Sequence, residues 1–179
     1  TLLPADLSPY SLSKKQFRDW LKYFALPVKV INVRIEQIYG PNDDSNKFLG
    51  WLLEQFEQNA ETIPLTAGDQ KRDFIYISDV VNAFIILIKN QANMPSFIDC
   101  DIATGTQTTI RSFVENVVDK YQNKFGITTT QLDFGAIQYR EKEPMSIKVN
   151  LDLLQSMGWK AHIDLDTGIK LTIDEWSSK

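Results

Sequence analysis

The chain is poor in the residues that build disulfides and metal sites. It contains one cysteine, Cys100, and one histidine, His162, among 179 residues. A single cysteine cannot form a disulfide within the chain, and a lone histidine without a second ligand or a nucleophile beside it is usually a surface or capping residue. We therefore expect a buried, unpaired Cys100, an exposed or capping His162 and no metal site.

Long apolar runs and an excess of positive charge are also missing. The longest apolar run, Ala83 to Ile88, is far shorter than the roughly 20 residues that a membrane helix needs. No basic and then apolar signal segment opens the chain. The net charge of −4 argues against a broad nucleic-acid-binding surface. We expect a cytoplasmic protein that binds neither membranes nor nucleic acids.

The pattern that is present alternates helical and extended segments, which is typical of an α/β protein. We expect helices at 8–24, 47–58, 78–90, 108–121, 151–157 and 165–176, and strands at 28–33, 63–66, 74–77, 97–102 and 131–134. Residues 138–144 are predicted to form the longest surface loop.

Capping and helical spacing add detail to these elements. Ser78 or Asp79 is expected to cap one helix, and Thr108 or Thr109 another, because their side chains can accept from free backbone N–H groups. Trp51, Phe56 and Phe84 lie at helical spacing and are most simply core residues. No clear linker divides the chain into independent domains.

The first chemical motif is Tyr10-Ser-Leu-Ser-Lys14 near the start of the first helix. Residues four apart share a helix face, so the Lys14 ammonium is expected beside the Tyr10 phenol. A nearby cation favours the phenolate and lowers a tyrosine pKa, which suits proton transfer to or from a sugar hydroxyl. A chain of this composition often contains such a pair by chance, so the motif gains its meaning from the other landmarks of the sequence.

Three such landmarks occur in order after Lys14. A buried strand ends at Arg34 and leads to Tyr39-Gly40-Pro41; then come Arg72-Asp73-Phe74-Ile-Tyr76 with Asp79, and finally Gly158-Trp159, Gly168 and Trp176. Together these landmarks resemble the extended short-chain dehydrogenases/reductases, the NAD-dependent nucleotide-sugar epimerases and dehydratases. The resemblance covers nearly the whole chain.

The resemblance implies a fold and its division. The chain is similar to the C-terminal part of a Rossmann-type α/β enzyme together with its smaller substrate-binding domain. Residues 1–37 would be the tail of the Rossmann-like domain. Residues 38–179 would form mainly the nucleotide-sugar-binding domain, with segments that return to the Rossmann core.

The resemblance also implies site residues. Tyr10 matches the catalytic proton donor and acceptor, and Lys14 the residue that binds the nicotinamide ribose of NAD or NADP. Arg72 matches an arginine that contacts the diphosphate, and a planar guanidinium suits phosphate oxygens. A salt bridge from Arg72 to Asp73 or Asp79 is the structural alternative. Glu143 or Glu141 matches the acid that holds the nucleotide ribose, with a solvated charge run as the alternative.

Two departures from the family pattern matter. Gln37 replaces the usual asparagine two residues before Tyr39, so it is only a candidate for substrate binding. The Glu36-Gln37 pair resembles a subset acting on deoxysugars of bacterial O-antigen synthesis, CDP-abequose synthase-like reductases among them. The glycine-rich dinucleotide motif is absent, since Gly68 and Gly105 are isolated, and we expect the N-terminal dinucleotide-binding half to be missing.

The implied activity is hydride transfer between C4 of a hexose and NAD(P), as a nucleotide-sugar 4-epimerase or 4-keto reductase. The alternatives are a 4,6-dehydratase and a non-catalytic nucleotide-sugar-binding module. The family forms homodimers through the tyrosine-bearing helix, so we expect Phe17, Leu21 and Phe24 to expose an apolar surface that self-associates. We expect no turnover by these 179 residues alone.

Overall fold

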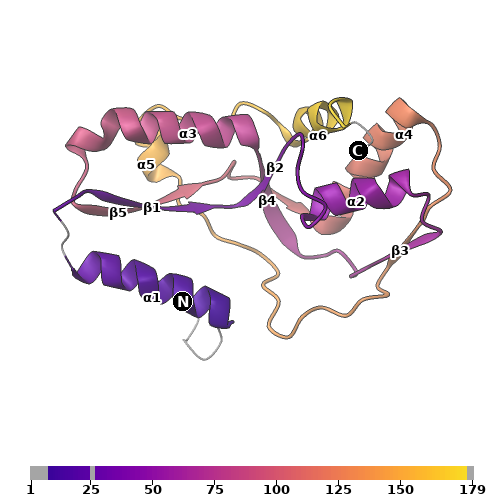
Figure 1. The fold of residues 1–179 in the computed structure, drawn as a ribbon, viewed down its shortest axis with the longest axis horizontal. Helices are drawn as coiled ribbons and strands as arrows, with labels where there is room; N and C mark the ends of the chain where they lie inside the picture. Colours follow the sequence, from indigo (N-terminus) through magenta and orange to yellow (C-terminus); the bar gives the residue numbers. More distant parts are fainter. Residues whose placement is uncertain (1–7, 25–26, 177–179) are drawn as a thin grey trace.

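The computed structural model describes residues 8–24 and 27–176. Its helices are α1 (Pro9–Tyr23), α2 (Phe48–Glu57), α3 (Ile77–Asn90), α4 (Ile110–Phe125), α5 (Asp152–Ser156) and α6 (Leu165–Asp174), with the short 3-10 helix η2 (Gln91–Asn93). Its strands are β1 (Val30–Ile35), β2 (Gln37–Tyr39), β3 (Thr62–Leu65), β4 (Lys71–Tyr76), β5 (Phe97–Ile102), β6 (Gln107–Thr109) and β7 (Gln131–Phe134). The predicted α/β class is confirmed (Figure 1).

The first part of the molecule is built on the parallel pair β1 and β5, whose register runs from Val30 opposite Phe97 to Ile35 opposite Ile102. Helices α3 and α5 lie over one face of this pair and α1 lies below the other (Figure 1). The α3 side is apolar, because alternate residues of both strands pack with α3 and α5. The members of this smaller core include Ile31, Val33, Ile98, Cys100, Ile102, Val80, Ala83, Leu87 and Leu154.

The opposite face of the same two strands is polar. Asn32 and Arg34 of β1 and Asp99 and Asp101 of β5 occupy the alternate positions, since successive side chains of a strand point to opposite sides. Arg18 of α1 donates to Asp99 through Nε at 2.8 Å and also pairs with it through the guanidinium NH2 group. Helix α1 therefore docks on this face through charge, and none of its residues is buried.

The larger core lies around β2, β4, β3, β7 and the three helices α2, α4 and α6. Strand β4 carries Phe74, whose ring stacks on Phe113 of α4 with centroids 3.9 Å apart. Strands β2 and β4 are parallel, β4 and β6 antiparallel, and β3 pairs in parallel with β7. A long loop leads from β7 back to α5 along one side of the molecule (Figure 1), and it includes the loop predicted at 138–144.

Two sequence landmarks that are far apart meet in this core. Tyr39 is 4% exposed and packs against Gly168 in α6. A Cβ atom on Gly168 would lie 2.1 Å from the Tyr39 hydroxyl oxygen, so no larger residue fits while that ring stays in place. Burial raises the pKa of Tyr39 above its ordinary range. The Tyr39-Gly40-Pro41 turn and the glycine of the closing segment are thus two halves of one contact.

The acidic residues around β4 and α3 hold backbone segments in place. Asp73 is 1% exposed and accepts from Thr104 N at 2.9 Å, Thr104 Oγ1 at 2.7 Å and Gly105 N at 2.7 Å. Asp79 is 3% exposed and accepts from the backbone N–H groups of His162 and Ile163. The cap predicted at Ser78 or Asp79 is wrong, because α3 begins at Ile77 and the Asp79 carboxylate serves the distant segment instead.

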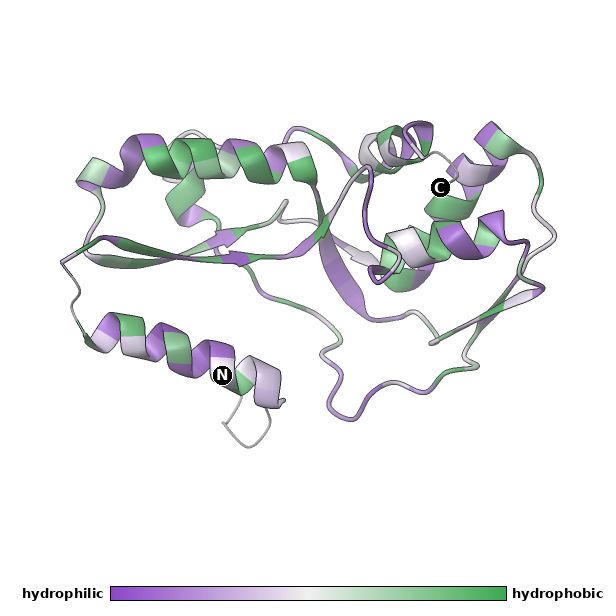
Figure 2. Ribbon diagram, viewed as in Figure 1, coloured by the Kyte–Doolittle hydropathy of each residue, from purple (hydrophilic) through white to green (hydrophobic). Residues whose placement is uncertain are grey.

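Other predictions of burial have mixed outcomes. Cys100 is 2% exposed, as predicted, and burial raises the pKa of its thiol to about 11. Phe56 is a core residue at 1% exposure, whereas Phe84 is 38% exposed on the outer side of α3, so its core assignment is wrong. Figure 2 shows α3 apolar along most of its length. No helix within the described ranges is both long and apolar enough to cross a membrane.

Candidate active site

The candidate site lies where the parallel strands β1 and β5 end. In open α/β sheets, ligands bind in the crevice outside the carboxyl ends of the strands. From this edge the chain continues through Glu36 into β2, and through Thr104 and Gly105 after β5. Helix α1 runs opposite to β1, so its N-terminal end lies toward the same edge (Figure 1).

Tyr10 and Lys14 lie at this N-terminal end of α1. Ser8 caps the helix by accepting from Ser11 N at 3.2 Å, and Pro9 stands at its first position, where its missing N–H costs nothing. The Lys14 Nζ atom lies 5.4 Å from the centre of the Tyr10 ring, so the two side chains share a face as predicted. Tyr10 is 71% exposed, and neither side chain forms a hydrogen bond within the described ranges.

A cavity of about 440 Å³ opens beside this edge and holds three predicted substrate-binding residues, Gln37, Arg72 and Glu143. Arg72 on β4 pairs with Glu143 through the guanidinium NH2 group and donates to Pro144 O at 2.8 Å. The alternative salt bridge from Arg72 to Asp73 or Asp79 is wrong, since both aspartates are bound to backbone groups elsewhere. Glu141 is exposed and does not line the cavity, so the geometry favours Glu143.

Aromatic side chains line one wall of this cavity. The sequence pattern assigned part of them to the core and left the others unassigned. Phe48 and Trp51 of α2 are stacked with ring centroids 6.0 Å apart and an interplanar angle of 25°, and both line the cavity. Trp51 was predicted as core, but it is only partly buried. Helical spacing predicted the correct helix face, yet it does not distinguish a wall packed by protein from a wall left open for a ligand.

The loop after β7 closes the cavity on its other side. Ile137 N donates to Leu65 O at 3.0 Å, and Lys71 N donates to Met145 O at 2.8 Å, so both ends of the loop are fixed to neighbouring strands. The Tyr139 hydroxyl accepts from Asp69 N at 3.0 Å. Tyr139 and Arg140 from this loop join the cavity lining. A second cation, Arg140, thus lines the same cavity as Arg72 and was not identified from sequence.

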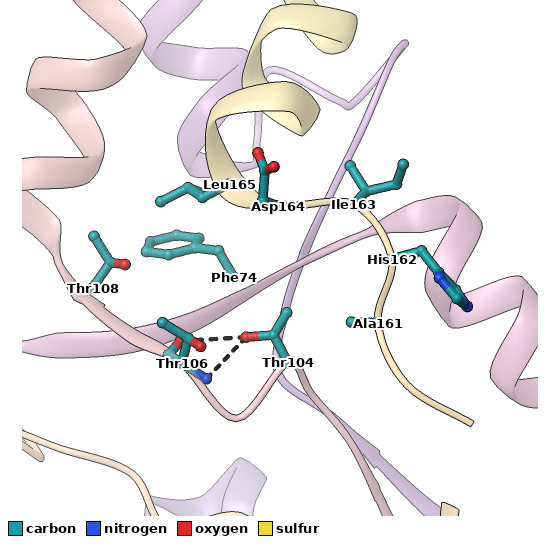
Figure 3. Close-up of a pocket in the computed structure, with 9 residues that line it drawn as sticks. All are labelled: Phe74, Thr104, Thr106, Thr108, Ala161, His162, Ile163, Asp164 and Leu165. Atoms are coloured by element: carbon teal, nitrogen blue, oxygen red, sulfur yellow. Dashed lines mark hydrogen bonds between the residues drawn. The ribbon is translucent and has the colours of Figure 1, made fainter. Parts of the chain in front are cut away.

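A smaller cavity of about 270 Å³ lies between β4, the turn after β5 and the start of α6 (Figure 3). Polar groups of this cavity already have hydrogen-bond partners within the protein. Thr104 Oγ1 donates to Asp73, and Asp164 caps α6 by accepting from Thr167 N at 2.8 Å. The imidazole of His162 points away from the threonines (Figure 3). His162 is exposed, as predicted, and this cavity contains none of the predicted site residues.

Comparison with known proteins identifies the family. The profile of the NAD dependent epimerase/dehydratase family matches residues 1–103. The chain belongs to this family.

Two curated relatives and one solved structure illustrate the relation. CDP-abequose synthase of Salmonella typhimurium is 31% identical over 166 residues, which are 92% of this chain and 54% of the relative. A putative UDP-glucose 4-epimerase of Methanocaldococcus jannaschii is 27% identical over 94% of this chain and 53% of its own length. The UDP-glucose 4-epimerase of Thermus thermophilus, solved with NAD, superposes with a TM-score of 0.76 at 20% identity, covering 94% of this chain and 53% of that one.

These coverages bear on the fold predicted from sequence. The chain spans about half the length of the curated relatives it matches. The matched part is an α/β segment of the extended short-chain dehydrogenase/reductase type, as predicted. The glycine-rich dinucleotide motif does not occur in the 179 residues.

Proposed function

We propose that this chain carries the acid–base tyrosine and the nucleotide-sugar site of an NAD(P)-dependent enzyme acting at C4 of a hexose, as a 4-epimerase or a 4-keto reductase. The observation that carries the proposal is the cavity lined by Gln37, Arg72 and Glu143 beside the strand edge toward which the Tyr10 end of α1 is directed. Both parts of the site belong to this one chain.

The cavity suits a nucleoside diphosphate. Its volume of about 440 Å³ lies within the range of small-molecule sites. The Arg72 guanidinium can bind diphosphate oxygens, and the Glu143 carboxylate can accept from ribose hydroxyls. The stacked rings of Phe48 and Trp51 offer an apolar wall for a base or a sugar. We propose Gln37 as an additional hydrogen-bonding group for the sugar or the phosphate.

Tyr10 and Lys14 suit the reacting end of the substrate. The Tyr10 hydroxyl can give a proton to, or take one from, the oxygen at C4 while the carbon is reduced or oxidised. When bound, NAD or NADP supplies the hydride acceptor or donor. The exposed Lys14 ammonium, which has three donors and no hydrogen bond within the described ranges, would hold hydroxyls of the nicotinamide ribose. The residues present fit that end of the cofactor and not its pyrophosphate, since the glycine-rich loop is not in this sequence.

Binding of nucleotide sugars to the 179-residue chain tests the cavity. Titration calorimetry with CDP-glucose, UDP-glucose and dTDP-glucose should detect binding of at least one of them. Arg72→Gln should weaken that binding about ten-fold, because a charged hydrogen-bond donor to the diphosphate is lost. Lys160→Gln, which removes one positive charge from an exposed position, serves as the control. Equal affinities of wild type and Arg72→Gln would reject Arg72 as a diphosphate ligand.

Substitution of the tyrosine tests the chemistry in an enzyme that joins this chain to a dinucleotide-binding half. Tyr10→Phe should lower kcat by about 100-fold or more, because general acid–base catalysis is lost, while sugar binding is unchanged. Tyr23→Phe, on an 81% exposed residue at the far end of α1, should leave kcat unchanged. Full activity of Tyr10→Phe would refute the proton-transfer role. A 6-deoxy-4-keto product would identify a dehydratase instead, and binding without turnover would identify a non-catalytic module.

A further inference from the structure

Glu36 lies at the strand edge that forms the candidate site. It is the first residue after β1, and its backbone N–H donates to Ile102 O at the end of β5 at 3.1 Å. The next residue, Gln37, lines the cavity that holds Arg72 and Glu143. Glu36 therefore stands between the end of the parallel pair and the proposed nucleotide-sugar cavity.

The alternation of side chains assigns Glu36 to the polar face of β1. Ile31 and Val33 pack with α3 and α5, whereas Asn32 bonds to Asp99 and Arg34 to Asp101 on the opposite face. Glu36 continues the even-numbered series. Its electrostatic neighbours include Arg34 and Asp101, which belong to that face. Glu36 is therefore on the side of the sheet that faces α1.

Register between α1 and β1 brings Glu36 level with Tyr10. Arg18 and Asn32 both bond to Asp99, at 2.8 Å and 2.7 Å, which aligns these two positions. From Arg18 back to Tyr10 the helix advances about 12 Å, at roughly 1.5 Å per residue. From Asn32 on to Glu36 the strand advances about 13 Å, at roughly 3.3 Å per residue. Because α1 and β1 run in opposite directions, both steps lead toward the same edge (Figure 1).

The carboxyl group of Glu36 differs from its charged neighbours in having no bound partner. Asp101 accepts from Arg34 Nε at 2.5 Å and from Asn150 N at 2.8 Å, and Arg72 is paired with Glu143. Glu36 is half-buried, and its carboxyl forms no hydrogen bond with any described residue. Both carboxyl oxygens of Glu36 therefore remain available to hydrogen-bond a bound ligand.

The charged groups around Glu36 also bear on its role. Burial raises the pKa of Glu36, and the negative Asp73 and Asp101 raise it further, while Arg72 and Arg34 act in the opposite direction. A partly buried carboxyl group is stabilised by hydrogen bonds from neutral donors, and no described residue supplies one to Glu36. Sugar hydroxyls are neutral groups that can both donate and accept.

We propose that Glu36 is a specificity-determining residue whose carboxyl group hydrogen-bonds a hydroxyl of the hexose, close to the carbon at which Tyr10 exchanges a proton. This role rests on the proposed function, since it places the hexose between the cavity and α1. It assigns recognition of the sugar to Glu36 and recognition of the diphosphate to Arg72.

The test compares each nucleotide sugar with its nucleoside diphosphate alone. For wild type and Glu36→Ala, calorimetry measures affinities for CDP-glucose against CDP and for UDP-glucose against UDP. Glu36→Ala should weaken binding of the preferred nucleotide sugar about ten-fold and leave the affinity for the diphosphate unchanged. Glu36→Gln, which keeps the shape and one acceptor oxygen, should restore most of the loss. Glu115→Ala, an exposed glutamate on α4, is the matched control.

The outcomes separate the two proposals. An equal loss for sugar nucleotide and diphosphate would show a structural role and overturn the assignment of Glu36. An unchanged preference for the nucleotide sugar over its diphosphate in Glu36→Ala would also overturn the assignment of Glu36, while the proposed function would stand. A wild-type chain that binds neither ligand would overturn the proposed function itself.

Discussion

Charged residues in this protein have two different roles, holding backbone segments in place and lining the cavity. Asp73 and Asp79 are buried and accept only from neighbouring groups of the protein, so they hold the turn after β5 and the segment before α6. Arg72, by contrast, lines an open cavity with its partner Glu143. The same short stretch of sequence therefore supplies both buried acids that hold the backbone and a cation that lines the cavity, and the two kinds differ in the burial of their side chains.

Asp99 provides a pH-dependent test of how α1 is attached. Hydrogen bonds from Arg18 and Asn32 lower the pKa of Asp99 to about 2, below the usual value of about 3.9. A carboxyl group whose pKa is lower in the folded state stabilises the fold above its unfolded pKa, and that contribution is lost as pH falls toward about 2. Urea unfolding of wild type between pH 5 and pH 2 should show this loss.

The comparison variant is Asp99→Asn, which has no charge to lose. Its free energy of unfolding should fall less than that of wild type over the same pH range, and Glu115→Gln should behave as wild type. Parallel curves for wild type and Asp99→Asn would contradict the contribution of the Arg18–Asp99 pair.

Among the elements, α1 is incompletely covered, and none of its residues is buried. Phe17 is 65% exposed and Phe24 52%, as predicted, but Leu21 is partly buried, and Trp20 and Tyr23 extend the apolar surface instead. Exposed apolar patches of this kind mark association sites. The tyrosine that we propose as the proton donor thus lies on a helix whose outer surface is suited to a partner helix.

We expect the chain to self-associate through α1. Light scattering at increasing protein concentration should show a mass above 20.5 kDa, because association removes Phe17 and Trp20 from water. The double variant Phe17→Ser/Trp20→Ser should shift the equilibrium to the monomer. Ile85→Ser/Ile88→Ser, on the exposed side of α3, is the control. A monodisperse wild-type monomer at high concentration would contradict self-association, and dissociation by the α3 variant alone would move the interface to α3.

Sequence patterns predicted the long elements well, because their hydrophobic periodicity is local. The short strands β2 and β6 were missed, since three residues carry no clear period and their pairing with β4 is set by contacts distant in sequence. Strand β1 lies two residues later than predicted because its register is fixed by β5. At the candidate site, the family resemblance predicted Gln37, Arg72 and either Glu143 or Glu141 as substrate-binding residues. The places of Trp51 and Arg140 in the cavity lining depend instead on how the loop after β7 closes over α2 and β4.

At the scale of the whole molecule, a small core around β1 and β5 adjoins a larger core around β4. We propose that the smaller core belongs to the Rossmann-like domain and the larger one to the nucleotide-sugar domain. Residues 75–102 and 153–161 contribute to the smaller core, so the chain passes between the two cores several times.

This division predicts what the 179 residues can do alone. They should bind a nucleotide sugar but transfer no hydride, because the glycine-rich loop needed for the cofactor pyrophosphate is not in the sequence. With CDP-glucose or UDP-glucose and NAD or NADP, the absorbance of reduced nicotinamide should stay constant. Chromatography should also show no new nucleotide sugar, since epimerisation consumes no net cofactor. The positive control is the same chain joined to a dinucleotide-binding half. Turnover by the isolated chain would contradict this expectation.

The contact between Tyr39 and Gly168 also joins two parts of the chain that are synthesised far apart in time. Tyr39 donates weakly to Leu165 O, 126 residues further along the chain. Its ring packs against Phe74, Tyr76 and Phe113, so a nascent chain that has emerged as far as α4 can cover part of it. The side that packs against Gly168 stays open until α6 has been synthesised, and the larger core is therefore completed only late in translation.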